Sequence, residues 1–334
     1  MKMKLLITGG AGFIGSNFIK FILNKHPDYK IINLDKLTYA GNPDNLKDIE
    51  TNKNYTFIKG DICDSDLVAK LMKDVDIVVH FAAETHVDRS MMEAGIFMQT
   101  DVFGTFTLLN AAKNNNIKKF IHISTDEVYG SIESGSVTED NPLNPANPYS
   151  ASKAGADLLA SSYFKAYKVP TIIVRSSNNF GPYQHVEKLI PLFATNAIEN
   201  EKLPLYGDGL NKREWLYVVD NCEAIDFLMH NGIVGQVYNV GSNIEKTNLE
   251  IAKNIVKHLG KREEIISFVK DRISHDKRYS IDCSKIRKLG WKPRFDFENA
   301  LKDTIKWYEK NSWLWSKIKT GNFKRYYKKQ YAER

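Results

Sequence analysis

A glycine-rich segment near the N-terminus, ITGGAGFIGS at residues 7–16, constrains the fold more than any other part of the chain. It follows a short apolar run and opens a pattern with helical periodicity. Its glycines fit two dinucleotide-binding spacings, one through Gly10, Gly12 and Gly15 and the other beginning at Gly9. Such a turn lets the backbone approach a pyrophosphate at a helix N-terminus. Because it stands between a strand and a helix, it predicts a βαβ unit that binds a dinucleotide.

The first 180 residues continue with the same alternation of strands and helices. Apolar residues run together in the strand-like segments, as expected for strands that are covered on both faces. We therefore predict an α/β fold, a doubly wound parallel sheet of the Rossmann type with a smaller mixed α/β C-terminal substrate domain. The predicted strands are 4–8, 30–35, 55–61, 76–83, 120–125 and 170–177, and the predicted helices are 15–26, 65–73, 92–116 and 148–168.

This alternation stops beyond about residue 180. Residues 203–220 are typical of short strands and loops, and 248–260 and 299–311 of amphipathic helices. We expect a nucleotide-binding domain at 1–180 and a mainly substrate-binding domain at 181–334, with part of the chain returning to the first sheet.

The composition describes a globular chain with an excess of positive charge. Of its 334 residues, 43% are hydrophobic and 26% are charged, and the formal net charge is +7. Such a charge favours anionic partners such as phosphates or nucleic acid. Part of the excess lies in the segment KIKTGNFKRYYKKQYAER at 317–334, which is either a solvated basic helix or, through interleaved Tyr and Lys, an RNA-binding surface.

The cysteines and the apolar segments indicate the cellular compartment of the protein. Cys63, Cys222 and Cys283 are far apart and form no metal-ligand pattern, so we expect reduced structural thiols and no metal. No apolar stretch is long enough to span a bilayer. We therefore expect a cytoplasmic protein without a membrane partner.

An acidic residue at the end of the second strand indicates which dinucleotide binds. Asp35 stands 20 residues after Gly15, where a carboxylate accepts hydrogen bonds from the ribose of the adenosine. A carboxylate there disfavours a 2′-phosphate, so NAD is preferred to NADP, although Lys36 is adjacent. Asp61 with Ile62, and the residues 81–83, end the next two strands at the same edge of the sheet.

Two groups of residues have the types needed for acid–base chemistry. Tyr149 and Lys153 are four residues apart and so share one helix face, where an ammonium favours the phenolate form of a tyrosine. Asp126 and Glu127 follow the fifth predicted strand directly, after Thr125. They are either surface charges of a loop or two acid–base groups directed at one substrate.

These motifs resemble those of the extended short-chain dehydrogenases/reductases, the NAD-dependent epimerases and dehydratases. Within that superfamily the chain closely resembles the dTDP-glucose 4,6-dehydratases. The resemblance covers nearly the whole chain and is carried by TGGAGFIG, DKLTYAGNPDNL, FAAETHVDRS, STDEVYG, NPYSASKAGAD, SSNNFGPYQHVEKLIP, LPLYGDGLNKREWLYVVD and RYSIDCSKIRKLGW.

The resemblance implies a reaction that employs both groups of residues. Tyr149 takes the proton of the sugar 4-hydroxyl while the C4 hydride moves to a tightly bound NAD+. Glu127 then removes the C5 proton and Asp126 protonates the departing 6-hydroxyl. Hydride then returns to C6 and a proton is restored at C5, so NAD+ is regenerated in each cycle and the product is the 4-keto-6-deoxy sugar. Thr125 bonds the oxygen at C4, and Lys153 orients the nicotinamide ribose.

The resemblance also assigns contacts residue by residue. Those for NAD are Gly9, Gly12, Phe13, Ile14, Gly15, Asp35, Lys36, Thr38, Asp61, Ile62, Phe81, Ala82, Ala83, Thr100, Tyr149, Lys153 and Asn178. Those for dTDP-glucose are Thr85, His86, Asp88, Thr125, Asn178, Glu187, Lys188, Leu189, Pro204, Tyr206, Arg213, Asn248, Arg272, His275 and Tyr279. The pyrimidine is placed by the resemblance near Pro204 and Tyr206, whose second interpretation is a core or turn role. His86 and Asp88 have a second interpretation as loop structure, and Glu187 and Lys188 as an exposed ion pair.

The chain departs from the usual pattern of these dehydratases without losing a catalytic group. One alternative is the same dehydration carried out on UDP-glucose. A second is a 4-epimerase, which needs no acid pair. A third is a non-catalytic protein that senses nucleotides or binds RNA. A homodimer through helices at about 100–114 and 150–167 is implied by the resemblance. The departures are Phe180, His185, Val186, Ile273, Ser274 and Asp101.

Overall fold

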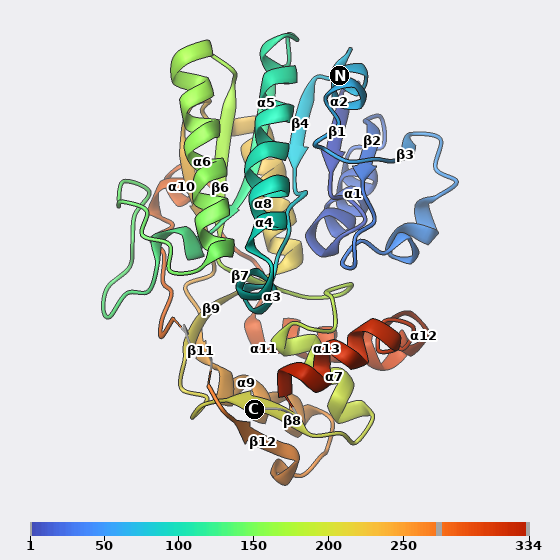
Figure 1. Cartoon of the computed structure of the whole chain (residues 1–334), viewed down its shortest axis with the longest axis vertical. Coiled ribbons are helices and arrows are strands. Elements are labelled where there is room, and N and C mark those ends of the chain that lie inside the picture. The colour runs from blue at the N-terminus through green and yellow to red at the C-terminus, as the bar shows by residue number, and fades with distance from the viewer. Residues whose placement is uncertain (1, 272–275, 332–334) are drawn as a thin grey trace.

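The structure is a computed structural model that describes residues 2–271 and 276–331. Its larger layer is a parallel sheet of seven strands in the order β10-β6-β5-β4-β1-β2-β3 (Figure 1). The reversal of strand order beside β1 makes this a doubly wound sheet, as predicted. The strands are β1 (Lys4–Thr8), β2 (Lys30–Asp35), β3 (Tyr55–Lys59), β4 (Ile77–His80), β5 (Lys119–Thr125), β6 (Thr171–Ser176) and β10 (Val237–Val240).

Helices cover both faces of this sheet. Leu5 and Ile7 of β1 pack into one core with Phe18 and Ile225, whereas Leu6 packs into another. Side chains alternate between the faces of a strand, so a run of apolar residues supplies both cores. One face carries α1 (Phe13–Lys25) and α8 (Val218–Asn231), and the other carries α2 (Ser65–Met72), α5 (Thr105–Lys113) and α6 (Pro148–Tyr167).

Two predicted elements differ from the structure. The helix predicted at 92–116 is divided into α4 (Ala94–Phe97), a π-helical turn η2 (Met98–Gly104) and α5, after a separate α3 (Val87–Met92). The hydroxyl of Thr105 donates to the carbonyl of Asp101 (2.5 Å), and such side-chain bonds to the backbone alter helix geometry. Residues 218–220, predicted as strand or loop, instead begin α8.

The second part of the structure has its own core and mixed strands. Phe193, Leu203, Ile251 and Leu301 are buried together there. β11 (Glu245–Thr247), β9 (Lys212–Tyr217) and β7 (Asn178–Phe180) form one sheet, and β12 (Ile266–Val269) pairs with β8 (Leu203–Tyr206). The helices of this part are α7 (Leu189–Ile198), α9 (Asn248–His258), α11 (Phe297–Lys310), α12 (Ser312–Trp315) and α13 (Gly321–Tyr331). A short helix, α10 (Ser284–Lys288), packs against β10 of the large sheet. Short helical turns along the chain are η1 (Pro43–Ile49), η3 (Asp126–Tyr129) and η4 (Glu263–Ile265).

The chain returns to the large sheet after it has entered the second part. β10 extends the sheet beside β6, in parallel register from Val237 opposite Ile173. The division of the chain at residues 180 and 181 remains a prediction. Among the described residues, no helix is both long and apolar enough to cross a membrane.

Candidate active site

The glycine turn lies between β1 and α1, at the carboxyl edge of the sheet. Gly9 has φ of +72°, and a Cβ there would come within 2.5 Å of the backbone nitrogen of Ala82. A Cβ on Gly15 would come within 2.4 Å of the carbonyl oxygen of Gly9. These two glycines are therefore required by the fold itself.

Gly12 has a different reason to be glycine. A Cβ there would meet only the carbonyl oxygen of Gly9, at 3.3 Å, so the protein leaves this side of the turn open. Gly12 is also the N-cap of α1, and no side chain caps that helix. Uncapped N–H groups at a helix N-terminus bind phosphate, so the turn fits the pyrophosphate of a dinucleotide.

Asp35 lies at the end of β2 beside this turn. Its two carboxylate oxygens accept hydrogen bonds from the backbone N–H groups of Ala11 and Leu37, both at 2.8 Å. Burial raises the pKa of Asp35, and the two backbone bonds act against that rise. Lys36 forms an ion pair with Asp61 (2.7 Å), which occupies its ammonium within the same cavity.

One cavity brings the predicted cofactor residues together. Its walls include every residue predicted to contact NAD, from Gly9 directly after β1 to Asn178 on β7. Further lining residues that the sequence did not indicate are Ala40, Gly41, Glu84, Ser124, Ser176 and Ser177. The lining offers carboxyl and hydroxyl oxygens, the backbone of the glycine turn and the ammonium groups of Lys36, Lys153 and Lys188, and these groups fit a dinucleotide.

The acidic pair occupies the end of β5, where the strand turns into η3. The hydroxyl of Thr125 accepts from the backbone N–H of Glu127 (3.2 Å), which caps the turn, and donates to Asp126 Oδ1 (3.1 Å). Asp126 is 2% exposed, and its Oδ2 atom has no hydrogen-bond partner among the described residues. Burial, then the charges of Glu127 and Glu214, raise the pKa of Asp126 well above its ordinary value. These surroundings favour the protonated form of Asp126.

Tyr149 and Lys153 lie on the first turns of α6. Asn147 and Ser150 form a capping box and Pro148 follows the N-cap, so the sequence fixes where this helix begins. The Lys153 ammonium donates to the carbonyl of Ile123 (2.8 Å), and burial lowers its pKa.

The expected lowering of the tyrosine pKa is not found. Burial raises the pKa of Tyr149 well above its ordinary value, and the charges of Glu127, Asp101 and Asp126 raise it further. The apolar surroundings and three carboxyl groups thus outweigh the neighbouring ammonium in the protein alone.

A second acidic pair, which the sequence did not indicate, lies beside Lys153. Asp101 Oδ2 accepts from the Ser152 hydroxyl (2.6 Å) and its Oδ1 accepts from the backbone N–H of Glu84 (2.8 Å). Burial raises the pKa of Asp101 to about 6. Burial and the charge of Asp101 together raise the pKa of Glu84 to about 7. Asp101 thereby joins the β4 loop to α6.

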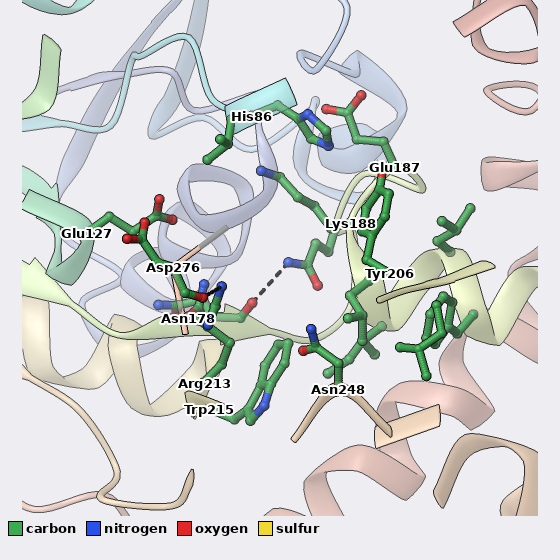
Figure 2. A pocket seen from close by; sticks show the side chains of 18 of the residues that line it. His86, Glu127, Asn178, Glu187, Lys188, Tyr206, Arg213, Trp215, Asn248 and Asp276 are labelled. Atoms are coloured by element: carbon green, nitrogen blue, oxygen red, sulfur yellow. Dashed lines mark hydrogen bonds between the residues drawn. The ribbon is translucent and has the colours of Figure 1, made fainter. Parts of the chain in front are cut away.

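A second cavity adjoins the first, and Figure 2 shows its lining. Glu127, Asn178 and Lys188 line both cavities, so a ligand in one meets a ligand in the other at these residues. Thr85 and Thr125 lie on the wall of the cofactor cavity. The other predicted substrate residues on the second wall are His86, Glu187, Leu189, Pro204, Tyr206, Arg213, Asn248 and Tyr279.

Glu187 lines this cavity but already has a buried partner. Its Oε2 atom lies 3.0 Å from Arg89 Nε, and its side chain is 1% exposed. Burial by itself would raise its pKa, but the charges of His86, His185 and Arg89 bring it to about 2. The alternative of an exposed pair with Lys188 is therefore corrected to a buried pair with Arg89.

Four predicted residues are not placed on the cavities by the structure. Asp126 is buried and lines neither wall, although its neighbour Glu127 lines both. Asp88 is buried outside both walls, 4.0 Å from His86 Nδ1, so the geometry does not support its contact with the substrate. Arg272 and His275 lie outside the described residues. Lining residues that the sequence analysis missed include Trp215, Asp276 and Tyr331. Trp215 and Asp276 stand within two or three residues of predicted contacts, whereas Tyr331 had no local signal.

A cavity lined by the predicted cofactor residues, a Tyr–Lys pair and a buried carboxyl next to a second carboxyl define the class. They belong to a Rossmann enzyme that modifies a nucleotide-linked substrate with the help of NAD. The chain matches the family of GDP-mannose 4,6 dehydratase over residues 6–304 and belongs to that family.

Relatives of known name agree with this class. The chain is 52% identical to the low-salt glycan biosynthesis protein Agl12 of Haloferax volcanii, over 92% of this chain and 98% of that protein. It is 46% identical to a dTDP-glucose 4,6-dehydratase of Streptomyces niveus, over 95% and 96% of the two chains. It is similar, with a TM-score of 0.93 and 47% identity, to the crystal structure of DesIV, a dTDP-glucose 4,6-dehydratase of Streptomyces venezuelae with NAD and TYD bound, covering 95% of this chain and 100% of that one.

Proposed function

We propose that this protein is an NAD-dependent dTDP-glucose 4,6-dehydratase, a hydro-lyase of deoxysugar biosynthesis such as the route to dTDP-rhamnose. It converts dTDP-glucose to dTDP-4-keto-6-deoxyglucose and water. Support comes from relatives of that name that match nearly the full length of the chain. The observation that carries the proposal is the pair of carboxyl groups at the end of β5, of which Glu127 lines both cavities and Asp126 is buried directly beside it.

The residues of the chain have separate tasks. NAD+, when bound, would accept the hydride from C4 and return it to C6, and a proton is then restored at C5. Tyr149 removes the proton of the 4-hydroxyl, and Thr125 holds the oxygen at C4. Lys153 positions the nicotinamide ribose. Buried groups whose pKa values are set apart by their surroundings act well as an acid and a base at neighbouring atoms.

The acidic pair performs the elimination. Once C4 is a ketone, the C5 proton is acidic and Glu127 removes it. Asp126, kept protonated by burial and by the charge of Glu127, gives its proton to the 6-hydroxyl, which leaves as water. A 4-epimerase needs Tyr149 and Lys153 but no proton donor at C6, so the protonated Asp126 favours the dehydratase over that alternative.

Product analysis tests this function and its nucleotide. Purified protein is incubated without added NAD with dTDP-glucose or UDP-glucose, and the product mass is followed. We expect loss of one water from the dTDP sugar. Conversion to a galactose isomer supports the epimerase instead, and faster dehydration of UDP-glucose supports the UDP alternative. The two nucleotides differ at a 5-methyl and a 2′-hydroxyl, and one methyl contributes only ~1 kcal/mol.

We also propose a homodimer formed through α5, α6 and η2. Phe103, Phe106 and Leu158 expose 45%, 39% and 62% of their area on these neighbouring elements. Exposed apolar side chains gathered on adjacent helices indicate a partner surface. Light scattering of the Leu158→Glu variant is expected to show a monomer, and an unchanged dimer would contradict this interface.

A cytoplasmic location is part of the proposal. Cys63, Cys222 and Cys283 are free thiols in the structure, in keeping with a reducing compartment. Fractionation of the source cells checks it, and recovery of the protein outside the cytosolic fraction would contradict it.

A further inference from the structure

The C-terminal helix α13 reaches the end of the substrate cavity that is remote from Glu127. Tyr331, in its last turn, lines the cavity together with Pro204 and Tyr206. Figure 2 shows Glu127 and Tyr206 on opposite sides of the cavity, with Arg213 and Lys188 between them. One end is therefore acidic, the middle carries cations, and the far end is aromatic.

Contacts of α13 fix this aromatic end. Gln330 is 1% exposed, and its amide Nε2 donates to the hydroxyl of Tyr206 (2.6 Å). The rings of Tyr331 and Tyr206 are 5.5 Å apart at an interplanar angle of 34°. Gln330 therefore holds one aromatic ring of the wall while its neighbour in the sequence supplies the other.

The same helix is attached to both parts of the molecule. The ring of Tyr326 lies 4.6 Å from the guanidinium of Arg89, which stands on α3 beside the cofactor cavity. The hydroxyl of Tyr327 accepts from the side-chain amide of Asn196 on α7 (3.1 Å). Its lysines, such as Lys328, are exposed, so the interleaved Tyr and Lys residues describe a helix with a packed aromatic face and a solvated basic face.

We propose that α13 completes the subsite for the nucleotide base: Tyr331 packs against the pyrimidine ring, and Gln330 is a positioning residue that holds Tyr206. The proposal rests on the proposed function, which supplies a nucleoside diphosphate sugar as the ligand. With its sugar at Glu127 and its diphosphate at Lys188 and Arg213, that ligand places its base at the aromatic end. Aromatic side chains stack on bases of any sequence.

Calorimetric titration of the full chain with dTDP and with inorganic pyrophosphate tests this. Tyr331→Ala is expected to weaken dTDP binding about tenfold and to leave pyrophosphate binding within about twofold, because pyrophosphate has no base. Tyr331→Phe, which keeps the ring, is expected to bind dTDP within about twofold of wild type. The matched control is Lys328→Ala, on the exposed face of the same helix, with no change for either ligand.

The positioning role has a separate readout. Gln330→Met keeps the length of the side chain and removes its amide, and we expect it to weaken dTDP binding about threefold, as for loss of one neutral hydrogen bond. Combined with Tyr206→Phe, its effect is expected to be less than additive because both changes remove one bond. An additive pair would contradict the positioning role.

The outcomes separate the two proposals. Equal weakening of dTDP and pyrophosphate by Tyr331→Ala, or no weakening of dTDP, would overturn the base subsite while the dehydratase function stands. Failure of the wild-type chain to bind dTDP would overturn the proposed nucleotide, and this inference with it.

Discussion

Two buried aspartates, Asp126 beside Glu127 of the site and Asp157 behind it on α6, have opposite electrostatic surroundings. Asp126, at the end of β5, faces Glu127 and Glu214, and its pKa lies well above the ordinary value after burial has raised it. Asp157, one turn beyond Lys153 on α6, is equally buried, yet its pKa is lowered because His122 and Arg175 offset the effect of burial. Arg175 Nε donates to Asp157 Oδ2 at 2.8 Å.

The two aspartates show which surroundings distinguish a reactive carboxyl from a structural one. Burial alone raises the pKa of both groups, so burial does not separate them. The neighbouring groups separate them: Asp157 has the Arg175 guanidinium within hydrogen-bond distance, whereas at Asp126 the charges of Glu127 and Glu214 act with burial and exceed the opposing effect of Arg213. A proton donor requires surroundings like those of Asp126. An ion pair that joins α6 to β6 requires a nearby cation, as Asp157 has.

The largest expected effect is on turnover by Asp126→Asn. The amide has the same shape but no proton to give, so kcat is expected to fall about 10²–10⁴-fold. The thermal midpoint is expected to change little because no buried cation loses its partner. Steady-state kinetics and calorimetry check both statements. A lower thermal midpoint with normal turnover would show that Asp126 is a structural residue and not the proton donor.

Removal of the neighbouring charge by Glu127→Gln tests the base. Loss of the C5 proton is expected to slow about 10²-fold or more, while reduction of NAD+ in a single turnover persists because Tyr149 performs that step. Exchange of the C5 proton with solvent is followed by mass spectrometry and NAD+ reduction by absorbance. Equal loss of both signals in a folded variant would contradict the role of Glu127.

Asp157→Asn is expected to affect stability most. It leaves Arg175 buried without its counter-charge, and breaking such a pair costs about 3–5 kcal/mol. Urea unfolding measures the loss. Arg175→Met with Asp157→Leu in one chain is the matched control and is expected to recover part of it. A loss below ~1 kcal/mol for Asp157→Asn would show that the pair is not what stabilises this contact.

The smallest expected effect is on the pH dependence of stability. Because the pKa of Asp126 is raised, its contribution is fully present below its ordinary pKa of 3.8 and is lost as pH rises through the folded-state value. Because the pKa of Asp157 is lowered, its contribution is present above 3.8 and is lost as pH falls through the folded-state value. Urea unfolding of each Asn variant against wild type across pH should give opposite slopes, and parallel curves would contradict the assignment.

Prediction from the sequence succeeds where local pattern fixes geometry. The glycine turn, Asp35, the strand end at Thr125 and the capped start of α6 depend on neighbouring residues, and the structure gathers them on one cavity. The fold class was predicted for the same reason, since runs of apolar residues and helix caps are local signals.

Prediction fails where the relevant contact is distant along the chain. Arg89 reaches Glu187 across 98 positions, and Gln330 reaches Tyr206 across 124. Asp101, on the π-helical turn, accepts hydrogen bonds from the backbone N–H of Glu84 and the hydroxyl of Ser152, which only the folded chain brings together. The protonation of Asp126 likewise depends on burial and on Glu214, from another strand.

The most direct test of the central claim is the fate of deuterium at C4 of dTDP-glucose. Tyr149, Glu127 and Asp126 acting as described move that atom to C6 of the product within one active site, with loss of one water and without added NAD. Mass spectrometry and NMR of the product are expected to show deuterium at C6. Deuterium retained at C4, or lost to the solvent, would contradict the account.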